Sequence, residues 1–304
     1  MSDLATFKAQ RTHLIGIAYR MLGEMSAAED VAQEAWLRWR QAAGEEIRDP
    51  RAWLSAVTVR LSLDALRKAR ARRETYVGPW LPEPILPDDT RALAADAPAA
   101  RAELASDLSL ALLYVLERLT PEERAALILH DAFDCDYAVI AAALEKNEAA
   151  CRKLVSRARE RVRQDRPRRT VSREQHRELV TRFVAAAAIN DEAAITRLLA
   201  KDAILYSDGG GKAKAALRPI YGADRVMRFT TGVMRKFAPK DGFDLVATEI
   251  NGSPGFLLRW ADGIHSALTL ETDGERVTTI YLVRNPDKLT RISRAAFLLS
   301  SPSA

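Results

Sequence analysis

One basic segment near the middle of the chain most constrains what the chain can fold into. Between Cys151 and Arg169 the sequence carries nine Lys or Arg residues against two acids. Apolar residues recur through the same stretch at helical spacing, at Ala150, Cys151, Leu154, Val155, Ala158 and Val162. This period predicts a helix over Asn147 to Arg169 with one apolar face and one basic face. Such a helix can pack one side in a small bundle and present the other to an anionic polymer, which makes the chain a candidate DNA reader.

The residues before this segment favour a helix-turn-helix. A short helix is expected over Tyr137 to Leu144, followed by a tight turn and then the longer basic helix. The turn lacks the usual glycine, so Asn147 is expected to act as turn residue and N-cap together. Further upstream, Thr120 to Glu123 combines an N-cap residue, a proline and two acids, which is typical of a helix start.

Length and composition limit the classes of protein that fit. A chain of 304 residues is long enough for two or three domains, each with its own core. The net charge of +5 is only mildly basic, so the distribution of charge is more informative. A second basic stretch, Arg60 to Arg73, holds six basic residues against one acid. Both stretches are compatible with phosphate binding, although a solvated helix face is the commoner alternative.

Neither disulfides nor membrane segments are expected. Cys135 and Cys151 show no metal-ligand spacing and no disulfide framework, so a cytoplasmic protein without bound metal is predicted. The first twenty residues contain charged side chains and lack the apolar core of a signal peptide. The sequence contains no apolar run approaching eighteen residues, so no membrane association is predicted.

The N-terminal block, about residues 5–75, is expected to be helical throughout. Ser26 to Glu29 has the pattern of a capping box, which predicts a helix start there. Asp30, Gln33 and Glu34 then fall opposite the apolar face of that helix and should be exposed. A further helix is expected from Pro50 to Arg73.

A proline-rich segment separates this block from the helix-turn-helix. Four prolines between Pro79 and Pro87 exclude a continuous helix and predict a stiff, extended linker. Trp80, Leu81 and Ile85 are apolar for an unstructured tether. The linker is therefore expected to dock on another surface.

The pattern changes again after Arg169. Helices are expected at Arg173 to Asn190, at Glu192 to Leu199 and at Ala223 to Phe237. An apolar run and four β-rich runs are expected to form strands: Ala203 to Tyr206, Phe243 to Ile250, Gly255 to Trp260, Ile264 to Thr272 and Arg276 to Val283. Asp262-Gly263 and Asp273-Gly274 are typical of hairpin turns. Helices followed by a meander of strands predict an α+β domain with an antiparallel sheet.

Residues 5–166 together resemble the bacterial extracytoplasmic-function (ECF) sigma factors. The segment Ala28 to Glu34 resembles the helix that docks on RNA polymerase. Asp49 to Leu54 and Asp64 to Lys68 resemble the promoter-melting and −10 segment, and Ala150 to Arg159 resembles the −35 recognition helix. Val139 and Leu154 stand where relatives often carry Glu and Arg, so the −35 sequence is left open.

The remaining residues resemble the ECF subgroup with a C-terminal SnoaL-like extension. The motifs are Tyr76 to Pro84, Asp208 to Lys212 and Asn285 to Leu289. The resemblance implies a multidomain fold of two all-α helical domains, the second a helix-turn-helix, followed by an α+β cone with a curved antiparallel sheet. The implied domains are region 2 over 1–75, the linker over 76–102, region 4 over 103–169 and a regulatory domain over 170–304.

The resemblance implies a role for particular side chains. The implied partners are promoter DNA and core RNA polymerase, through its clamp and flap regions. The polymerase-binding residues are Asp30, Gln33 and Glu34. The −10 residues are Arg60, Arg67 and Lys68. The −35 residues are Arg152, Lys153, Ser156, Arg157, Arg159 and Arg161. The interdomain regulatory residues are Trp80, Asp208, Gly209, Gly210, Gly211, Lys212, Asn285, Pro286, Asp287 and Lys288.

Two other functions stay open at this point. A helix-turn-helix regulator could respond to a small ligand in the C-terminal cone, but it would need no polymerase-binding block. An enzyme with a DNA-binding appendage could place Tyr206, Asp208, Trp260 and His265 around a polar pocket and transfer a proton there. The favoured interpretation is a sigma factor that catalyses nothing, needs no cofactor or metal, and is regulated by its own cone.

Overall fold

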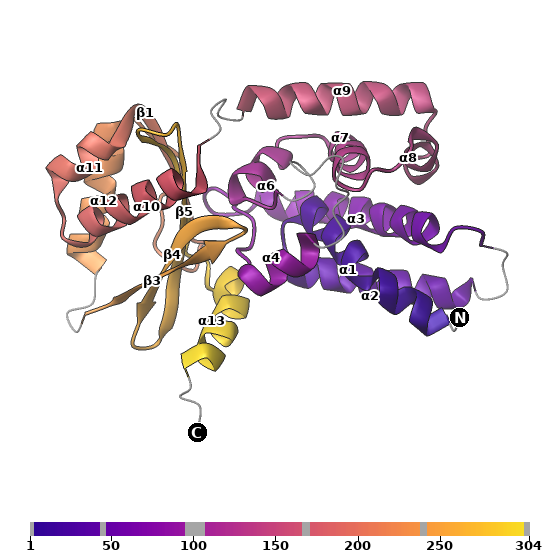
Figure 1. Cartoon of the computed structure of the whole chain (residues 1–304), viewed down its shortest axis with the longest axis horizontal. Coiled ribbons are helices and arrows are strands. Elements are labelled where there is room, and N and C mark those ends of the chain that lie inside the picture. Colours follow the sequence, from indigo (N-terminus) through magenta and orange to yellow (C-terminus); the bar gives the residue numbers. More distant parts are fainter. Residues whose placement is uncertain (1–2, 43–46, 95–106, 166–170, 238–241, 301–304) are drawn as a thin grey trace. The chain divides into compact units, whose positions relative to one another are not determined.

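The computed structural model describes residues 3–42, 47–94, 107–165, 171–237 and 242–300 (Figure 1). The chain divides into two compact units. The helical unit comprises residues 1–75, 88–108 and 112–166, and the C-terminal unit comprises residues 76–87, 109–111 and 167–304. Within the described ranges, no helix is long and apolar enough to cross a membrane.

The helical unit begins with three helices that pack on one another: α1 (Asp3–Leu22), α2 (Met25–Gln41) and α3 (Pro50–Glu74). Burial of the apolar face of α2, including Ala28, Val31 and Ala35, holds this helix in the bundle. The capping-box prediction at Ser26 is wrong. Helix α1 ends at Leu22, the next residue Gly23 reverses the chain with a φ of +71°, and α2 starts at once with Glu24 at the N-cap position.

The second half of the helical unit contains shorter helices: α4 (Pro87–Ala94), α6 (Leu110–Leu116), α7 (Pro121–Leu127), the π-helical turn η2 (Ile128–Ala132), α8 (Tyr137–Leu144) and α9 (Glu148–Asp165). The predicted helix start at Thr120 is confirmed as a complete capping box with Glu123. The short helix α8 and the N-cap at Asn147, which accepts from the Ala150 amide at 2.8 Å, are also confirmed. The turn residue is instead Glu145, in the left-handed region at φ +55°.

Two arginines join the halves of the helical unit. The buried Arg124 guanidinium donates to the Met21 carbonyl at 2.6 Å and pairs with Glu117 at the same distance. Arg60 of α3 donates to the Ala142 carbonyl at 2.7 Å, at the C-terminal end of α8. Helix carbonyls at a C-terminus lack intrahelical donors and carry partial negative charge, so they attract a guanidinium. The α3 bundle and the helix-turn-helix therefore pack together within one unit.

The C-terminal unit is an α+β fold, as predicted. Its helices are α10 (Arg173–Ala188), α11 (Glu192–Leu198), α12 (Ala223–Phe237) and α13 (Pro286–Ser300). Its strands are β1 (Leu199–Asp208), β2 (Ile220–Tyr221), β3 (Asp244–Ile250), β4 (Ser253–Trp260), β5 (Gly263–Thr272) and β6 (Val277–Val283). They form one sheet in the order β2-β1-β6-β5-β4-β3.

The sheet is mixed, whereas the sequence predicted an antiparallel one. The meander β3 to β6 is antiparallel, and β1 pairs with β6 in parallel, with Tyr206 opposite Tyr281. The difference follows from the long connection between β1 and β6, which carries α12 and four strands. Helices α10, α11 and α12 bury one face of the sheet around Phe183, Ile195 and Ile280. Figure 1 shows the three helices gathered beside the strands.

Candidate functional sites

The predicted polymerase-binding residues lie on the solvent side of α2. Asp30 and Gln33 are exposed, and Glu34 is half-buried and pairs with Arg38 one turn later at 3.0 Å. An exposed pair within one helix contributes little to stability. This face therefore offers carboxylate and amide groups that a basic protein surface could bind, and the role stays a prediction.

The predicted −10 residues lie along one exposed side of α3. Arg67 pairs with Asp64 at 2.8 Å, with both side chains mostly in solvent, and Lys68 is exposed. Arg60 differs, because its guanidinium is held by the carbonyls of α8. The side chains of 69–74, which belong to the second basic stretch, lie outside the described residues, as do residues 43–46.

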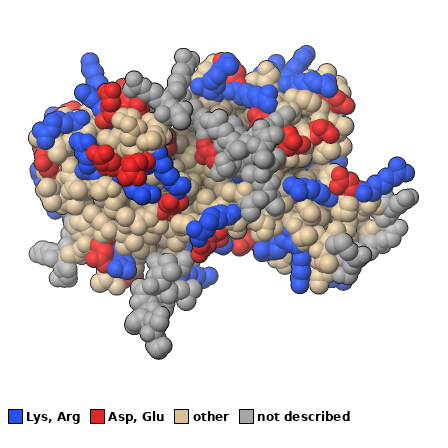
Figure 2. Space-filling view, viewed as in Figure 1, with Lys and Arg blue, Asp and Glu red and all other residues tan. Residues whose placement is uncertain are grey.

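Helix α9 buries Cys151, Val155, Ala158 and Val162 and turns its basic side chains outward, as its period predicted. Figure 2 shows blue basic atoms interleaved with red acidic ones where α9 lies. Lys153 is exposed in the second turn of the helix, the part that meets base edges in a recognition helix, and Ser156 and Arg157 are exposed near its middle. Arg152 is exposed as well; it pairs with Glu148 at 2.7 Å and lies over the Tyr137 ring.

Two of the predicted −35 arginines are engaged with buried acids. Arg159 donates to Asp131 of η2, with one contact at 2.8 Å, and Arg161 donates to Glu123 of α7 at 2.8 Å. Burial raises the pKa of Asp131, but hydrogen bonds from Arg159 and His130 outweigh it and hold that pKa below its usual value. The bond to Asp131 likewise raises the pKa of Arg159. Both arginines therefore fasten α9 to the helices beneath it, whatever else they contact.

The C-terminal unit holds residues 76–87 of the proline-rich linker through a polar cluster. We define the linker-docking cluster as Asp208 at the end of β1 with Asn285 and Lys288 at the start of α13. The Asp208 carboxylate is completely buried. It accepts from the Tyr76 hydroxyl at 2.5 Å, the Leu81 amide at 2.8 Å and the Lys288 ammonium at 2.8 Å.

Lys288 also contacts the linker directly in two ways. Lys288 is 5 % exposed and donates to the Leu81 carbonyl. Its ammonium also lies 4.0 Å from the centre of the Trp80 ring, a cation–π contact that is strong when desolvated. Leu81 and Ile85 are fully buried. The linker thus docks on the C-terminal unit through one buried ion pair, backbone hydrogen bonds and apolar side chains.

The glycine loop after β1, Gly209 to Gly211, requires glycine for a different reason at each position. A Cβ on Gly209 would lie 2.2 Å from the Ala213 carbonyl, and one on Gly210 would lie 2.4 Å from Asn285 Nδ2. Only a Cβ on Gly211 would approach the linker, at 3.2 Å from Val77. Gly210 and Gly211 also have positive φ angles of 59° and 73°.

Each residue from Asn285 to Lys288 has an identifiable role at the start of α13. Asn285 caps the helix by accepting from the Asp287 amide at 3.1 Å, and Pro286 occupies the first helical position. Asp287 in the first turn pairs with Lys212 at 2.6 Å, and both are largely exposed. The cap aims Lys288 back at Asp208, so the glycine loop and this motif form one site. Their regulatory role stays a prediction.

Two docking residues, Tyr76 and Asn251, had no individual role assigned from the sequence. Asn285 donates to the Tyr76 hydroxyl at 3.0 Å, so Tyr76 bridges Asn285 and Asp208. Asn251, at φ +55° in the β3–β4 turn, accepts from the Ile85 amide at 3.0 Å and donates its own amide to the Ile85 carbonyl. A buried asparagine in a two-residue turn looks like ordinary turn chemistry, so no sequence signal marks it as a docking residue.

The four residues of the enzyme alternative do not form one site, although Trp260 and His265 stack on each other at 3.8 Å between ring centres. Among the described residues, Trp260 lines an apolar pocket in the cone, while Asp208 is committed to the linker. Tyr206 stacks on Tyr281, and His265 bonds to Asp262 at 2.6 Å, which lowers the pKa of that acid. The described ranges also contain no group of three acidic, His or Cys side chains that could hold a metal. Among the described lining residues, the geometry therefore offers no acid–base pair inside the pocket.

Comparison with known proteins agrees with this division of the chain. Residues 6–72 match the Sigma-70 region 2 family and residues 109–162 the Sigma-70 region 4 family. The chain is 39% identical over 299 residues to the ECF RNA polymerase sigma factor SigJ of Mycobacterium tuberculosis, covering 95% of this chain and 93% of that protein. It is 31% identical to the probable ECF RNA polymerase sigma factor SigI of the same organism, covering 94% of each.

A solved structure extends the likeness to the whole fold. The crystal structure of the Mycobacterium tuberculosis extracytoplasmic function sigma factor SigJ has a TM-score of 0.72 and 36% identity, covering 94% of this chain and 98% of that one. Both promoter-binding regions and the C-terminal cone are therefore shared. The chain belongs to the extracytoplasmic-function RNA polymerase sigma factors.

Proposed function

We propose that this sigma factor directs core RNA polymerase to promoters with −10 and −35 elements, catalyses no reaction, and is modulated by its own cone through the docked linker. The observation that carries the regulatory part is the burial of Asp208 with Lys288 around the linker backbone. A ligand-responsive regulator would need no region 2, which the chain has.

The residues divide into three proposed contacts. Asp30, Gln33 and Glu34 bind the polymerase clamp, with the flap as a second contact of the enzyme. Lys153, Ser156 and Arg157 read and hold the −35 element, because they are exposed within the first ten residues of α9. Arg152, Arg159 and Arg161 hold phosphates while keeping their ion pairs. Arg60, Arg67 and Lys68 track the −10 strand.

The packing of the helical unit implies that it opens on promoter DNA. The −35 and −10 elements lie about 25 base pairs apart, or about 85 Å along B-DNA. Arg60, a −10 residue, is hydrogen-bonded to α8 of the helix-turn-helix. One compact unit cannot place Arg60 and α9 at both elements, so α3 and α8 must separate and the Arg60 contacts must break.

The linker limits how far that separation can go. It joins α3 to the helices that lead into the helix-turn-helix, and residues 76–87 are docked on the cone. A fully extended chain spans about 3.3 Å per residue, so fixing these twelve residues removes up to about 40 Å of reach. We therefore propose that docking restrains initiation and that undocking raises it.

Reconstituted transcription tests both parts of this function. The full chain is added to core polymerase with a library of promoter fragments, and promoter-specific transcripts are measured. Absence of specific initiation would sink the sigma assignment for this chain. The cone's role is tested separately with Asp208→Ala, which should raise transcript yield if the protein stays folded by circular dichroism.

A further inference from the structure

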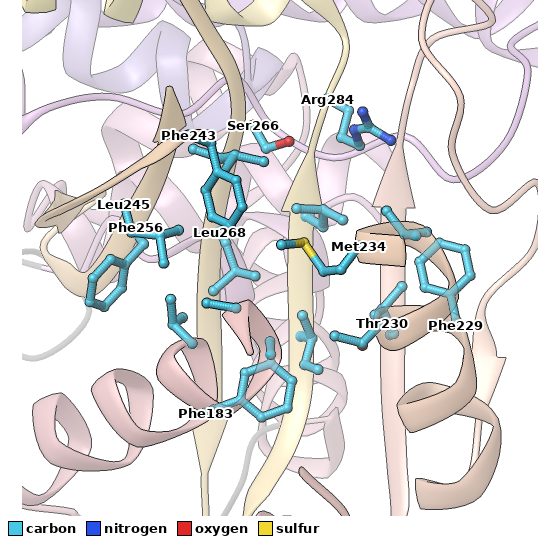
Figure 3. Close-up of a pocket in the computed structure, with 18 of the residues that line it drawn as sticks. Phe183, Phe229, Thr230, Met234, Phe243, Leu245, Phe256, Ser266, Leu268 and Arg284 are labelled. Atoms are coloured by element: carbon cyan, nitrogen blue, oxygen red, sulfur yellow. The ribbon is translucent and has the colours of Figure 1, made fainter. Parts of the chain in front are cut away.

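The cone contains an apolar pocket between its sheet and its helices. The pocket encloses about 110 Å³ and is lined by side chains of α10, α12 and strands β3 to β6. Figure 3 shows Phe183, Phe229 and Met234 around its body and Ser266 with Arg284 at one end. An apolar cavity of about 150 Å³ holds benzene, so this somewhat smaller pocket, which is partly open to solvent, has room for at most one ring.

Two hydrogen-bond donors at the pocket are buried without a partner. Within the described part of the chain, no acceptor lies within hydrogen-bond distance of Arg284 Nε or Trp260 Nε1. Such groups cost free energy unless a partner satisfies them. Both atoms can only donate, so the missing partner must be an acceptor.

The sheet register brings these polar groups to the same end of the pocket. Leu258 of β4 pairs with Ser266 of β5, and Trp260 lies two residues farther along β4 on the same face. Leu268 pairs with Leu282 of β6, so Arg284, two residues beyond Leu282, falls beside Ser266. The opposite end, around Phe183, is apolar (Figure 3).

Arg284 also gives that end a positive charge. Among the described lining residues it is the charged one, and burial lowers the pKa of its guanidinium. An arginine remains protonated even so, and its Nη1 already donates to the Lys214 carbonyl at 2.6 Å. Among the described residues, Arg284 Nε is therefore an unpaired donor at the polar end of the pocket, covered by protein, and a small shift of the side chain would present it to an anion.

We propose that this pocket binds a small aromatic carboxylate. The ring occupies the apolar body beside Phe183 and Met234, and the carboxylate accepts from Arg284 Nε at the polar end. Among the described residues that line the pocket, none belongs to the linker-docking cluster, so ligand binding and linker docking use different side chains.

A charge series of one-ring compounds tests the proposal on the full-length protein. Benzoate, toluene and benzylamine have similar ring sizes and carry negative, zero and positive charge. Isothermal titration should show benzoate binding at least about tenfold more tightly than toluene, as expected for one charge-assisted hydrogen bond. Benzylamine should not bind measurably.

Matched variants locate the site. Arg284→Met keeps the aliphatic stem and should abolish the preference of benzoate over toluene, while Arg284→Lys should keep part of it. Ala187→Phe fills the pocket from α10 and should abolish binding of both compounds. Ala185→Phe is the control, because Ala185 is exposed on the same helix. Equal binding of benzoate and toluene to the wild type, or no binding of either, would overturn the proposal, and so would benzoate binding that survives Ala187→Phe.

Arg284 also adjoins the linker-docking cluster, since its backbone amide donates to the Asp208 carbonyl at 2.7 Å. We expect benzoate to change transcript yield with the wild type and not with Arg284→Met. This coupling rests on the proposed function, whereas binding is measured without polymerase. Binding without any change in yield would refute the coupling and leave the site intact.

Discussion

The exposed face of α9 and the linker-docking cluster use the same charged residue types in opposite surroundings. On α9, Lys153 and Arg157 are exposed and Arg152 pairs in solvent, so each group adds little to stability and is available to a phosphate. In the cluster, Asp208 and Lys288 are buried on each other and on the linker backbone. The exposed charges on α9 can therefore change partners at a small cost in free energy, whereas disturbing the buried charges that hold the linker costs several times more.

The largest expected effect comes from breaking the buried pair. Asp208→Ala leaves the Lys288 ammonium buried without its carboxylate, so the free energy of unfolding of the C-terminal unit should fall by about 3–5 kcal/mol. Urea denaturation followed by tryptophan fluorescence measures this. Lys212→Ala is the control, since the exposed Lys212–Asp287 pair should contribute less than about 1 kcal/mol. Similar losses for the two variants would erase the contrast between exposed and buried charge.

The buried histidine His13 of the helical unit extends the comparison of exposed and buried groups to one that stays neutral. His13 is 2 % exposed, bonded to Ser55 at 2.9 Å, and burial together with Arg51 and Arg20 lowers its pKa to about 3. The unfolded chain therefore binds a proton that the folded one refuses, from about pH 6.5 downward. Stability should fall as pH drops from 6.5 towards 3, with a slope approaching about 1.4 kcal/mol per pH unit. His13→Gln should flatten that part of the curve; an unchanged slope would show that His13 titrates normally.

Two substitutions on α9 separate fastening from DNA contact. Arg159→Gln leaves the buried Asp131 short of its strongest donor and should cost about 1–3 kcal/mol of stability. Lys153→Gln should leave the melting temperature unchanged and reduce the salt dependence of promoter binding by about one counterion. Differential scanning calorimetry and fluorescence anisotropy over a salt series give the two readouts. If Lys153→Gln destabilised the fold as much as Arg159→Gln, the division of α9 into two functions would fail.

The smallest effect tests the glycine loop. Gly211→Ala must hold a Cβ at φ +73° against Val77, which should cost about 1–2 kcal/mol and loosen the linker. Gly242→Ala at φ +90° meets no atom within 4 Å among the described residues, so it bears the strain without touching the linker. Limited proteolysis within residues 76–87 should accelerate for Gly211→Ala alone. Equal cleavage of the two variants would remove Gly211 from the docking site.

Local patterns in the sequence predicted most elements because they follow from neighbouring residues. The β-rich run of β5 and the apolar stripe of α9 are examples, and the cap at Thr120 is another. The prediction at Ser26 was wrong because the reversal at Gly23 starts α2 two residues earlier than the capping pattern implied. The parallel pairing of β1 with β6 depends on contacts distant in the sequence, which no local pattern encodes.

The candidate sites show the same limit. Helical periodicity places Arg159 and Arg161 on the outer face of α9, and both are indeed exposed. It cannot reveal their partners Asp131 and Glu123, which lie 28 and 38 residues away. The apolar residues of the linker indicated docking, and the motifs around Asp208 and Lys288 indicated a site. Only the fold shows that the Asp208–Lys288 ion pair joins these two motifs and binds the linker backbone.

Transcription by a double variant tests the central claim most directly. Asp208→Asn combined with Lys288→Met removes both buried charges, so no lone charge is left and the cone should stay folded. The cluster then lacks the Asp208–Lys288 ion pair, and the docked linker loses the Lys288 hydrogen bond to Leu81 and the cation–π contact with Trp80. With core polymerase, we predict more promoter-specific transcript than from the wild type, while Lys212→Ala with Asp287→Ala gives wild-type yield. Wild-type or lower yield from a folded Asp208→Asn, Lys288→Met protein would contradict the account.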